Sequence, residues 1–301
     1  YYKERNAEIR GQLNELYKPV EIDKRDRLDL VQAAEIHADR RDLLTEIAYY
    51  RLRQDAERGY MRCYRYMREA VLTGDLMLYI QIQTEIQAFL SEKDANGQPV
   101  VIDEEVRTLL TWEMLISPIA HAWIAREFDT LFQRINNLRA NSVLNIYWSI
   151  PTYQASLDMW EAYARTLRGG QDNFDLASVA FQRAIQRINT YLDGNDLSKA
   201  LIWQAKSILA TSYRLLGYLQ RQQGLIDLAI TNYKKALPLL RAIDLRIELA
   251  IALNDLGFAL TQRGQWTDAR ALVNDAKEMR RDLGMRGAVA LSLNTLAQIE
   301  L

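Results

Sequence analysis

Few side chains in this sequence could bind a metal or act as a nucleophile, and they are widely scattered. His37 and His121 are the only histidines and Cys63 is the only cysteine in 301 residues. Zinc sites usually take their ligands from closely spaced pairs. Because these three residues lie far apart, we interpret the histidines as unrelated surface or half-buried side chains. A single cysteine cannot form a disulfide framework, which is typical of a cytoplasmic protein.

Sequence motifs for phosphate binding and acyl transfer are also missing. The chain has no G-x-x-x-x-G-K-[ST] loop, and its nearest glycine cluster, RGGQ at 168–171, lacks the lysine that such a loop needs. It has no G-x-S-x-G motif either. Glu57, Glu104 and Glu105 stand beside residues suited to salt bridges, and nothing marks them as general acids. We therefore expect a non-catalytic chain with no cofactor and no bound metal.

Charge and composition restrict the partners and the fold. Lys and Arg number 38 against 39 Asp and Glu, so the net charge of −1 gives no electrostatic attraction to nucleic acid or to an anionic membrane. No apolar run approaches the roughly 18 residues that a membrane span requires. We expect neither partner, and a cytoplasmic location. With only 13 Gly and 5 Pro, and helix-forming residues dominant, the composition is typical of an all-α protein.

Apolar residues recur at helical spacing along most of the chain, so the segments that position other side chains are predicted to be helices. Gly74 fits the end of one helix and Asp75 the N-cap of the next. Asp103 can cap a helix that runs to about Ile116. Ser117-Pro118 then indicates the start of a further helix, with a proline kink inside one longer helix as the alternative. An uninterrupted helical pattern runs from about residue 197 to 223.

Near-identical segments recur 40 residues apart in the C-terminal third. LGYLQRQQGLIDLAITNYKKA at 216–236 aligns with LGFALTQRGQWTDARALVNDA at 256–276. Glycine inside a helix costs about 1 kcal/mol against alanine, so Gly217 and Gly257 indicate places where a second helix comes close. The later glycines of each segment, Gly224 and Gly264, are predicted to end the first helix in a left-handed conformation. The segments are therefore predicted to be consecutive helix pairs.

This pattern resembles the tetratricopeptide repeat (TPR), which has Leu-Gly in its first helix, a turn glycine, and small residues flanking an aromatic in its second helix. Tyr233 fills the aromatic position, whereas Val273 departs from it. A degenerate unit upstream pairs 157–167 with a helix around Phe181. The resemblance implies an all-α, right-handed superhelix of antiparallel helix pairs, a TPR-like solenoid with a period of about 40 residues where the common form has about 34.

A second resemblance covers the segment at 40–90, which begins RRDLLTEIAYYRLRQ. It is similar to the helical region that follows the NTPase and winged-helix modules of bacterial STAND-class signalling ATPases, which share their layout with NOD-like receptors. In that family a TPR-like array is the C-terminal sensor. The chain begins YYKER without a Met, which we interpret as a piece of a longer protein. We expect an N-terminal helical region that leads into the array at 1–92 and degenerate helical repeats at 93–195. TPR-like repeats are expected at 196–301, and the last of them is incomplete.

Repeat geometry predicts where a partner would bind, because the first helices of such an array line its concave side. Arg214, Tyr218 and Arg221 share one helical face, and equivalent positions follow in later repeats. The groove candidates are Arg214, Tyr218, Arg221, Asn254, Phe258, Gln262, Asn294 and Gln298. The leucines beside them, Leu253, Leu256, Leu293 and Leu296, are expected to pack inward. Exposed Arg and Asn in such a groove could hold a carboxylate or a peptide backbone; the alternative is that they cap helices or solvate the surface.

The resulting hypothesis is a sensor or scaffold that binds a protein, a peptide or a small-molecule effector in the groove. From the STAND resemblance, binding would relieve autoinhibition of an NTPase outside these residues, in a defence or regulatory system. The intramolecular partner would then be that NTPase. Two alternatives stay open: a constitutive TPR adaptor, and the sensor region of a transcriptional regulator.

Overall fold

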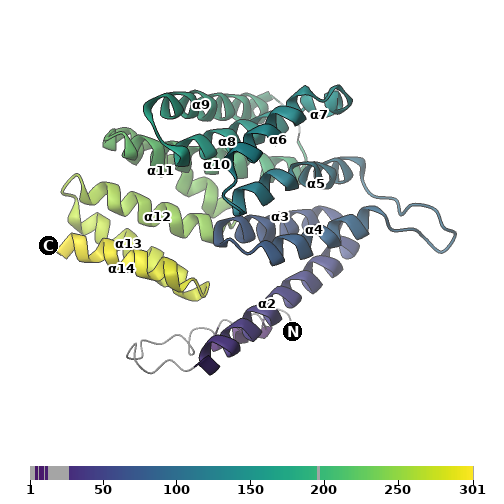
Figure 1. The fold of residues 1–301 in the computed structure, drawn as a ribbon, viewed down its shortest axis with the longest axis horizontal. Helices are drawn as coiled ribbons and strands as arrows, with labels where there is room; N and C mark the ends of the chain where they lie inside the picture. The colour runs from purple at the N-terminus through teal and green to yellow at the C-terminus, as the bar shows by residue number, and fades with distance from the viewer. Residues whose placement is uncertain (1–3, 6, 10, 13–26, 195–196, 301) are drawn as a thin grey trace. The chain divides into compact units, whose positions relative to one another are not determined.

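The computed structural model describes residues 4–5, 7–9, 11–12, 27–194 and 197–300, and within these ranges the chain is helical, without a β-strand (Figure 1). An isolated antiparallel bridge joins Lys93 and Pro99 inside the turn-rich segment that separates two helices. The predicted all-α, TPR-like solenoid of antiparallel helix pairs is confirmed.

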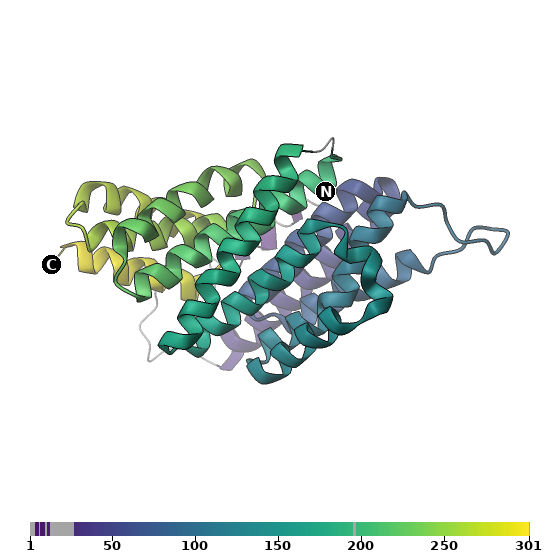
Figure 2. The same ribbon diagram turned by 90° about the horizontal axis from the view of Figure 1, so that it is seen from above.

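The chain divides into two compact units, Tyr1–Met114 with Lys277–Leu293 and Leu115–Ala276 with Asn294–Leu301. In the first unit, α2, α3 and α4 pack on one another. In the second, α8 packs along α9 and α10 along α11, and Figures 1 and 2 show both pairs side by side. The helices are α2 (Arg27–Gln54), α3 (Ala56–Thr73), α4 (Leu76–Leu90), α5 (Glu104–Ile124), α6 (Phe128–Ala140), η2 (Ser142–Leu144), α7 (Asn145–Trp148), α8 (Pro151–Arg168), α9 (Gln171–Gly194), α10 (Lys199–Gln222), α11 (Ile226–Ala242), α12 (Arg246–Thr261), α13 (Trp266–Asp282) and α14 (Arg286–Glu300).

The predicted helix boundaries in the N-terminal part are confirmed by their caps. Gly74 ends α3 in the left-handed conformation, with φ of 74°. Asp75 caps α4 by accepting a hydrogen bond from the Leu78 N–H at 3.0 Å. Asp103 accepts in the same way from the Val106 N–H at 3.1 Å. Each carboxylate satisfies a backbone donor that the first helical turn leaves without an intrahelical partner.

Pro118 corrects one boundary, because no new helix begins there. α5 continues through the proline from Glu104 to Ile124, so the alternative of one longer helix is the right one. Proline inside a helix removes one backbone hydrogen bond and costs about 3 kcal/mol. Ile116, Ile119 and Ala120 are buried on both sides of it, and this apolar burial offsets the cost of the proline.

Close approach of helices explains the glycine inside each repeat. A Cβ added to Gly217 in α10 would lie 3.0 Å from Cδ1 of Tyr233 in α11. A Cβ added to Gly257 in α12 would overlap Cγ2 of Val273 in α13 and lie 3.1 Å from the Ala269 carbonyl oxygen. A side chain at either position would therefore push the paired helix away.

The helices α10 to α13 all end in the same left-handed turn, at intervals of 20 residues. The left-handed residues are Gly224, Asp244, Gly264 and Gly284, with φ of 76°, 55°, 72° and 71°. After each one, the next backbone N–H donates to the carbonyl five residues earlier, at 2.8, 3.1, 3.0 and 2.9 Å, as in a Schellman motif. The 40-residue repeat therefore consists of two helical halves of 20 residues each.

Candidate functional site

Three of the predicted groove residues come together on α10 and α12. The guanidinium carbon of Arg221 lies 5.3 Å from the ring centre of Tyr218 and 4.8 Å from that of Phe258. All three side chains are half-buried. A cation between two aromatic faces is attracted by both ring quadrupoles, so the arginine of one repeat is held against the aromatic of the next.

Two other groove candidates are not exposed, contrary to the sequence-based expectation. Arg214 is 4% and Asn254 is 8% exposed. Nη1 of Arg214 lies 4.0 Å from Oδ2 of Asp255. The physical reason is that α8, α9, α11 and α12 all pack on α10, which leaves Arg214 no solvent-facing side. Asn254 lies on α12, which also packs on both α10 and α11.

The same charges surround the hydroxyl of Tyr233, the aromatic of the second helix. Burial raises the pKa of the Tyr233 phenol, and the Asp255 carboxylate raises it further, while Arg221 and Arg214 oppose the rise. The net direction is upward, so the phenol stays neutral at physiological pH. Tyr233 therefore joins the packing around Gly217 to the charged cluster of α10 and α12.

The remaining candidates are spread over the surface. Gln262, Asn294 and Gln298 are exposed, and within the described part of the chain none of them makes a hydrogen bond, ion pair or ring contact with Arg221. Leu253 and Leu256 are buried as expected, and Leu296 is half-buried. The expectation for Leu293 is wrong, because its side chain is 52% exposed.

The reason for the exposed leucine is the rotation of α14 about its axis. The buried positions of this helix include Ser292, Thr295 and Ile299, which lie on one helical face at spacings of three and four residues. Leu293 and Asn294 fall beside that face. The repeated LN pair of α12 and α14 therefore does not have the same environment in both helices.

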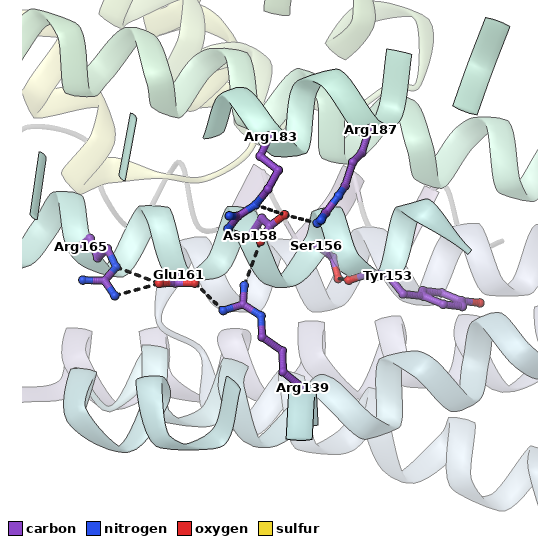
Figure 3. A network of polar contacts seen from close by, with 8 residues as sticks. All are labelled: Arg139, Tyr153, Ser156, Asp158, Glu161, Arg165, Arg183 and Arg187. Carbon is purple, nitrogen blue, oxygen red and sulfur yellow. Dashed lines mark hydrogen bonds and ion pairs between the residues drawn. The ribbon is translucent and has the colours of Figure 1, made fainter. Parts of the chain in front are cut away.

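A buried acidic residue that the sequence did not single out lies at the centre of a second cluster (Figure 3). The Asp158 side chain on α8 is 3% exposed. Its Oδ1 accepts from Nη2 of Arg139 at 2.9 Å and from Nη2 of Arg183 at 2.8 Å. Its Oδ2 accepts from Nε of Arg183 at 3.0 Å and from Nη1 of Arg187. One carboxylate thus holds three guanidinium groups that come from α6 and α9.

Glu161, one helical turn further along α8, extends this cluster. It accepts from Nη1 of Arg139 at 2.6 Å and from Nε of Arg165 at 2.9 Å. Burial alone would raise the pKa of Glu161, but the hydrogen bonds and charges of the two arginines outweigh it and lower the pKa. Hydrogen bonds with Asp158 likewise raise the pKa of Arg183. Glu161 is therefore charged at neutral pH, and four guanidiniums surround the two carboxylates of the cluster.

A cavity of about 440 Å³ opens beside this cluster. Its lining residues are Arg139, Trp148, Gln154, Leu157, Asp158, Arg183 and Arg187. A signal for it was present in the sequence: Asp158 stands among apolar residues in LDMWEAYA, and Arg183 and Arg187 are one turn apart. Nothing in the sequence showed that the two segments meet.

The described residues give little indication of metal binding or nucleophilic chemistry. They contain no group of three or more His, Cys, Asp or Glu that could hold a metal ion. Burial raises the pKa of the Cys63 thiol, which makes it a poor nucleophile. Burial lowers the pKa of His37 and of His121. Among the described residues, no helix is both long enough and apolar enough to cross a membrane.

The fold and these clusters define a class, an all-α helical-repeat protein with TPR-like helix pairs. No family model and no curated protein matches the sequence. Among solved structures, the chain is similar to a Signal Transduction ATPase with Numerous Domains (STAND) protein with a tetratricopeptide repeat sensor from Pyrococcus horikoshii. The identity is 11% and the TM-score 0.38, over 98% of this chain and 54% of that one. The chain thus spans about half the length of that structure.

Proposed function

We propose that this chain is a non-catalytic binding module that holds a protein, a peptide or a small-molecule effector on the surface formed by α10 and α12. The observation that carries the proposal is Arg221, held between the rings of Tyr218 and Phe258 in two consecutive repeats. Flanking rings restrict the rotamers of this arginine, so less entropy is lost when it donates to an acceptor on a partner.

The chemistry of this surface favours a partner that offers a carboxylate or a backbone carbonyl. A guanidinium carries five N–H donors in a fixed plane and accepts nothing. Its aromatic neighbours add apolar contact area, and aromatic residues with arginine are the side chains most often decisive in interfaces. We extend the proposal to a switching role: in a longer protein, binding here would relieve autoinhibition of an NTPase module through an intramolecular contact.

The binding test uses a peptide library in which each sequence has either a free or an amidated C-terminus. Affinity for the 301-residue chain is measured by fluorescence polarisation. Removal of a charge-assisted hydrogen bond costs about 1.5–3 kcal/mol, so Arg221→Ala should weaken the best peptide about tenfold or more. Arg241→Ala, an exposed arginine on α11, is the matched control and should bind normally. Equal affinity of Arg221→Ala and the wild type would remove this surface from the proposal.

A constitutive adaptor and the sensor region of a transcriptional regulator remain the alternative functions. They are separated from the switching role by the full-length gene. A P-loop ATPase module encoded with this chain, whose ATP hydrolysis rises when the peptide is added, supports the sensor. A gene without such a module leaves the adaptor, and one with a DNA-binding module leaves the transcriptional regulator.

A further inference from the structure

We propose that the cavity beside Asp158 binds a small phosphorylated molecule through Arg139, Arg183 and Arg187. This site shares no residue with the surface around Arg221 and does not depend on the function proposed for it. It is formed by side chains of α6, α7, α8 and α9, which all belong to the unit Leu115–Ala276 with Asn294–Leu301.

Asp158 acts as a positioning residue in this site. It is buried and fixes three guanidiniums from two other helices, and one of them, Arg183, donates to both of its oxygens. Each guanidinium has five donors, so this anchoring uses only part of their capacity. The side chains of Arg139, Arg183 and Arg187 remain 35%, 44% and 33% exposed. The anchored arginines therefore keep donors that can reach a ligand in the cavity.

The charge of the cluster favours a phosphate over a carboxylate. Four arginines surround two carboxylates, Asp158 and Glu161, an excess of two positive charges. The same two carboxylates are the acidic groups that act electrostatically on Arg183. A phosphate monoester carries about −1.5 to −2 charges at pH 7, so it would neutralise the excess. A carboxylate would leave about one positive charge uncompensated.

The remaining lining residues indicate the rest of the ligand. Small-molecule sites commonly measure about 300–1,000 Å³, and this cavity, of about 440 Å³, lies within that range. Trp148 borders it with a half-buried ring. The side chain of Gln154 fixes the end of α7 by donating to the Trp148 carbonyl oxygen at 2.8 Å. An aromatic side chain in the same lining as three arginines suits a phosphate attached to a planar ring.

Isothermal titration calorimetry with phenyl phosphate, inorganic phosphate and benzoate tests the site on the 301-residue chain. We expect saturable binding of phenyl phosphate, with benzoate at least about tenfold weaker because it carries a single charge. Arg187→Gln should weaken phenyl phosphate about tenfold or more, while Asp158 keeps Arg139 and Arg183 in place. Affinity should also fall from pH 7.5 to pH 5, because the second phosphate pKa is near 6.

The matched control is Arg168→Gln, which removes an exposed arginine at the end of α8 that pairs with Asp129 and does not line the cavity. It should leave the affinity unchanged. Far-UV circular dichroism establishes that each variant folds, and Arg187→Lys, which keeps the charge, should bind better than Arg187→Gln. The proposal is overturned if phenyl phosphate shows no saturable binding up to roughly 10 mM. A dissociation constant above that concentration corresponds to a binding free energy weaker than about 3 kcal/mol. Equal affinity in Arg187→Gln and the wild type overturns it as well.

Discussion

Replacing Gly257 with alanine tests whether the helices of a repeat approach as closely as the structure indicates. In an open helix this change should stabilise the protein by about 1 kcal/mol, because alanine is the better helix former. At Gly257 the new methyl group would overlap Cγ2 of Val273 and lie 3.1 Å from the carbonyl oxygen of Ala269. The steric effect therefore opposes the helix propensity.

The net magnitude follows from these two terms. Overpacking a well-packed core costs about 1–3 kcal/mol, and the gain in propensity recovers about 1 kcal/mol. We expect Gly257→Ala to lower the free energy of unfolding by about 1 kcal/mol, measured by urea denaturation followed by circular dichroism. Gly287→Ala is the control, because nothing lies within 4 Å of a Cβ at that helical position, and it should raise the free energy of unfolding by up to about 1 kcal/mol.

A double-mutant cycle with Val273→Ala isolates the steric term. Removing the valine methyl groups should turn the effect of Gly257→Ala from destabilising to stabilising, a coupling of about 2 kcal/mol, within the range measured for residues in contact. A gain of about 1 kcal/mol from Gly257→Ala in the wild-type background, with no coupling to Val273, would refute the close approach of α12 and α13.

Four further changes have expected outcomes. Gly264→Ala should cost about 1–2 kcal/mol of unfolding free energy, because the left-handed φ of 72° disfavours a Cβ. Asp158→Asn should cost about 3 kcal/mol, since it leaves three arginines without their buried counter-charge; a denaturation midpoint equal to that of the wild type would contradict this. Trp203→Phe removes a buried indole hydrogen bond to the Ile243 carbonyl oxygen and should cost about 1–2 kcal/mol. Glu161 has a pKa below its ordinary value of 4.5 in the folded protein, so the stability it adds is present above that value and is lost as the pH falls through the folded pKa. Glu161→Gln should therefore flatten the decline in unfolding free energy from about pH 5 to pH 3, measured by urea titrations across that range.

Much of the repeat could be predicted from sequence because its determinants are local. Gly217 and Gly257 marked close helix contacts, and Gly224 and Gly264 marked left-handed turns, and all four have the predicted role. These roles depend on backbone geometry that glycine permits and other residues disfavour. A residue type alone was therefore sufficient to indicate the conformation.

The division of each repeat into two halves of 20 residues could not be predicted from residue types in the same way. Asp244 occupies the turn where the neighbouring repeats have glycine. Aspartate tolerates the left-handed conformation as a single residue, but it also occurs at caps and in ordinary turns. Its identity therefore did not indicate this turn, although the fold requires the same geometry there as at Gly224 and Gly264.

The cluster around Asp158 was beyond sequence reasoning for a different reason. Its arginines come from α6 and α9, while the acid lies on α8. Periodicity predicts which face of a helix is apolar, but the partner of a buried charge depends on which helices meet and at what rotation. The same limitation explains why Arg214 was expected in the groove. Its position in the repeat fitted a groove residue, but four helices pack on α10 and bury its side chain.

The arginines around Asp255 and those around Asp158 differ in how accessible they are to a ligand. This difference determines how the effect of a substitution on binding should be interpreted. The Arg214 side chain is 5% exposed and has Asp255 beside it, so any effect of Arg214→Ala on binding would pass through the packing of α10 and α12. Removing one member of a buried pair typically costs about 3–5 kcal/mol, enough to unfold a marginal domain. Arg187 is one-third exposed and lines a cavity. When Arg187 is replaced, Asp158 still pairs with two other arginines. If replacing Arg187 weakens binding and leaves the denaturation midpoint unchanged, Arg187 contacts the ligand directly. Replacing Arg214 should instead change the affinity and the denaturation midpoint together.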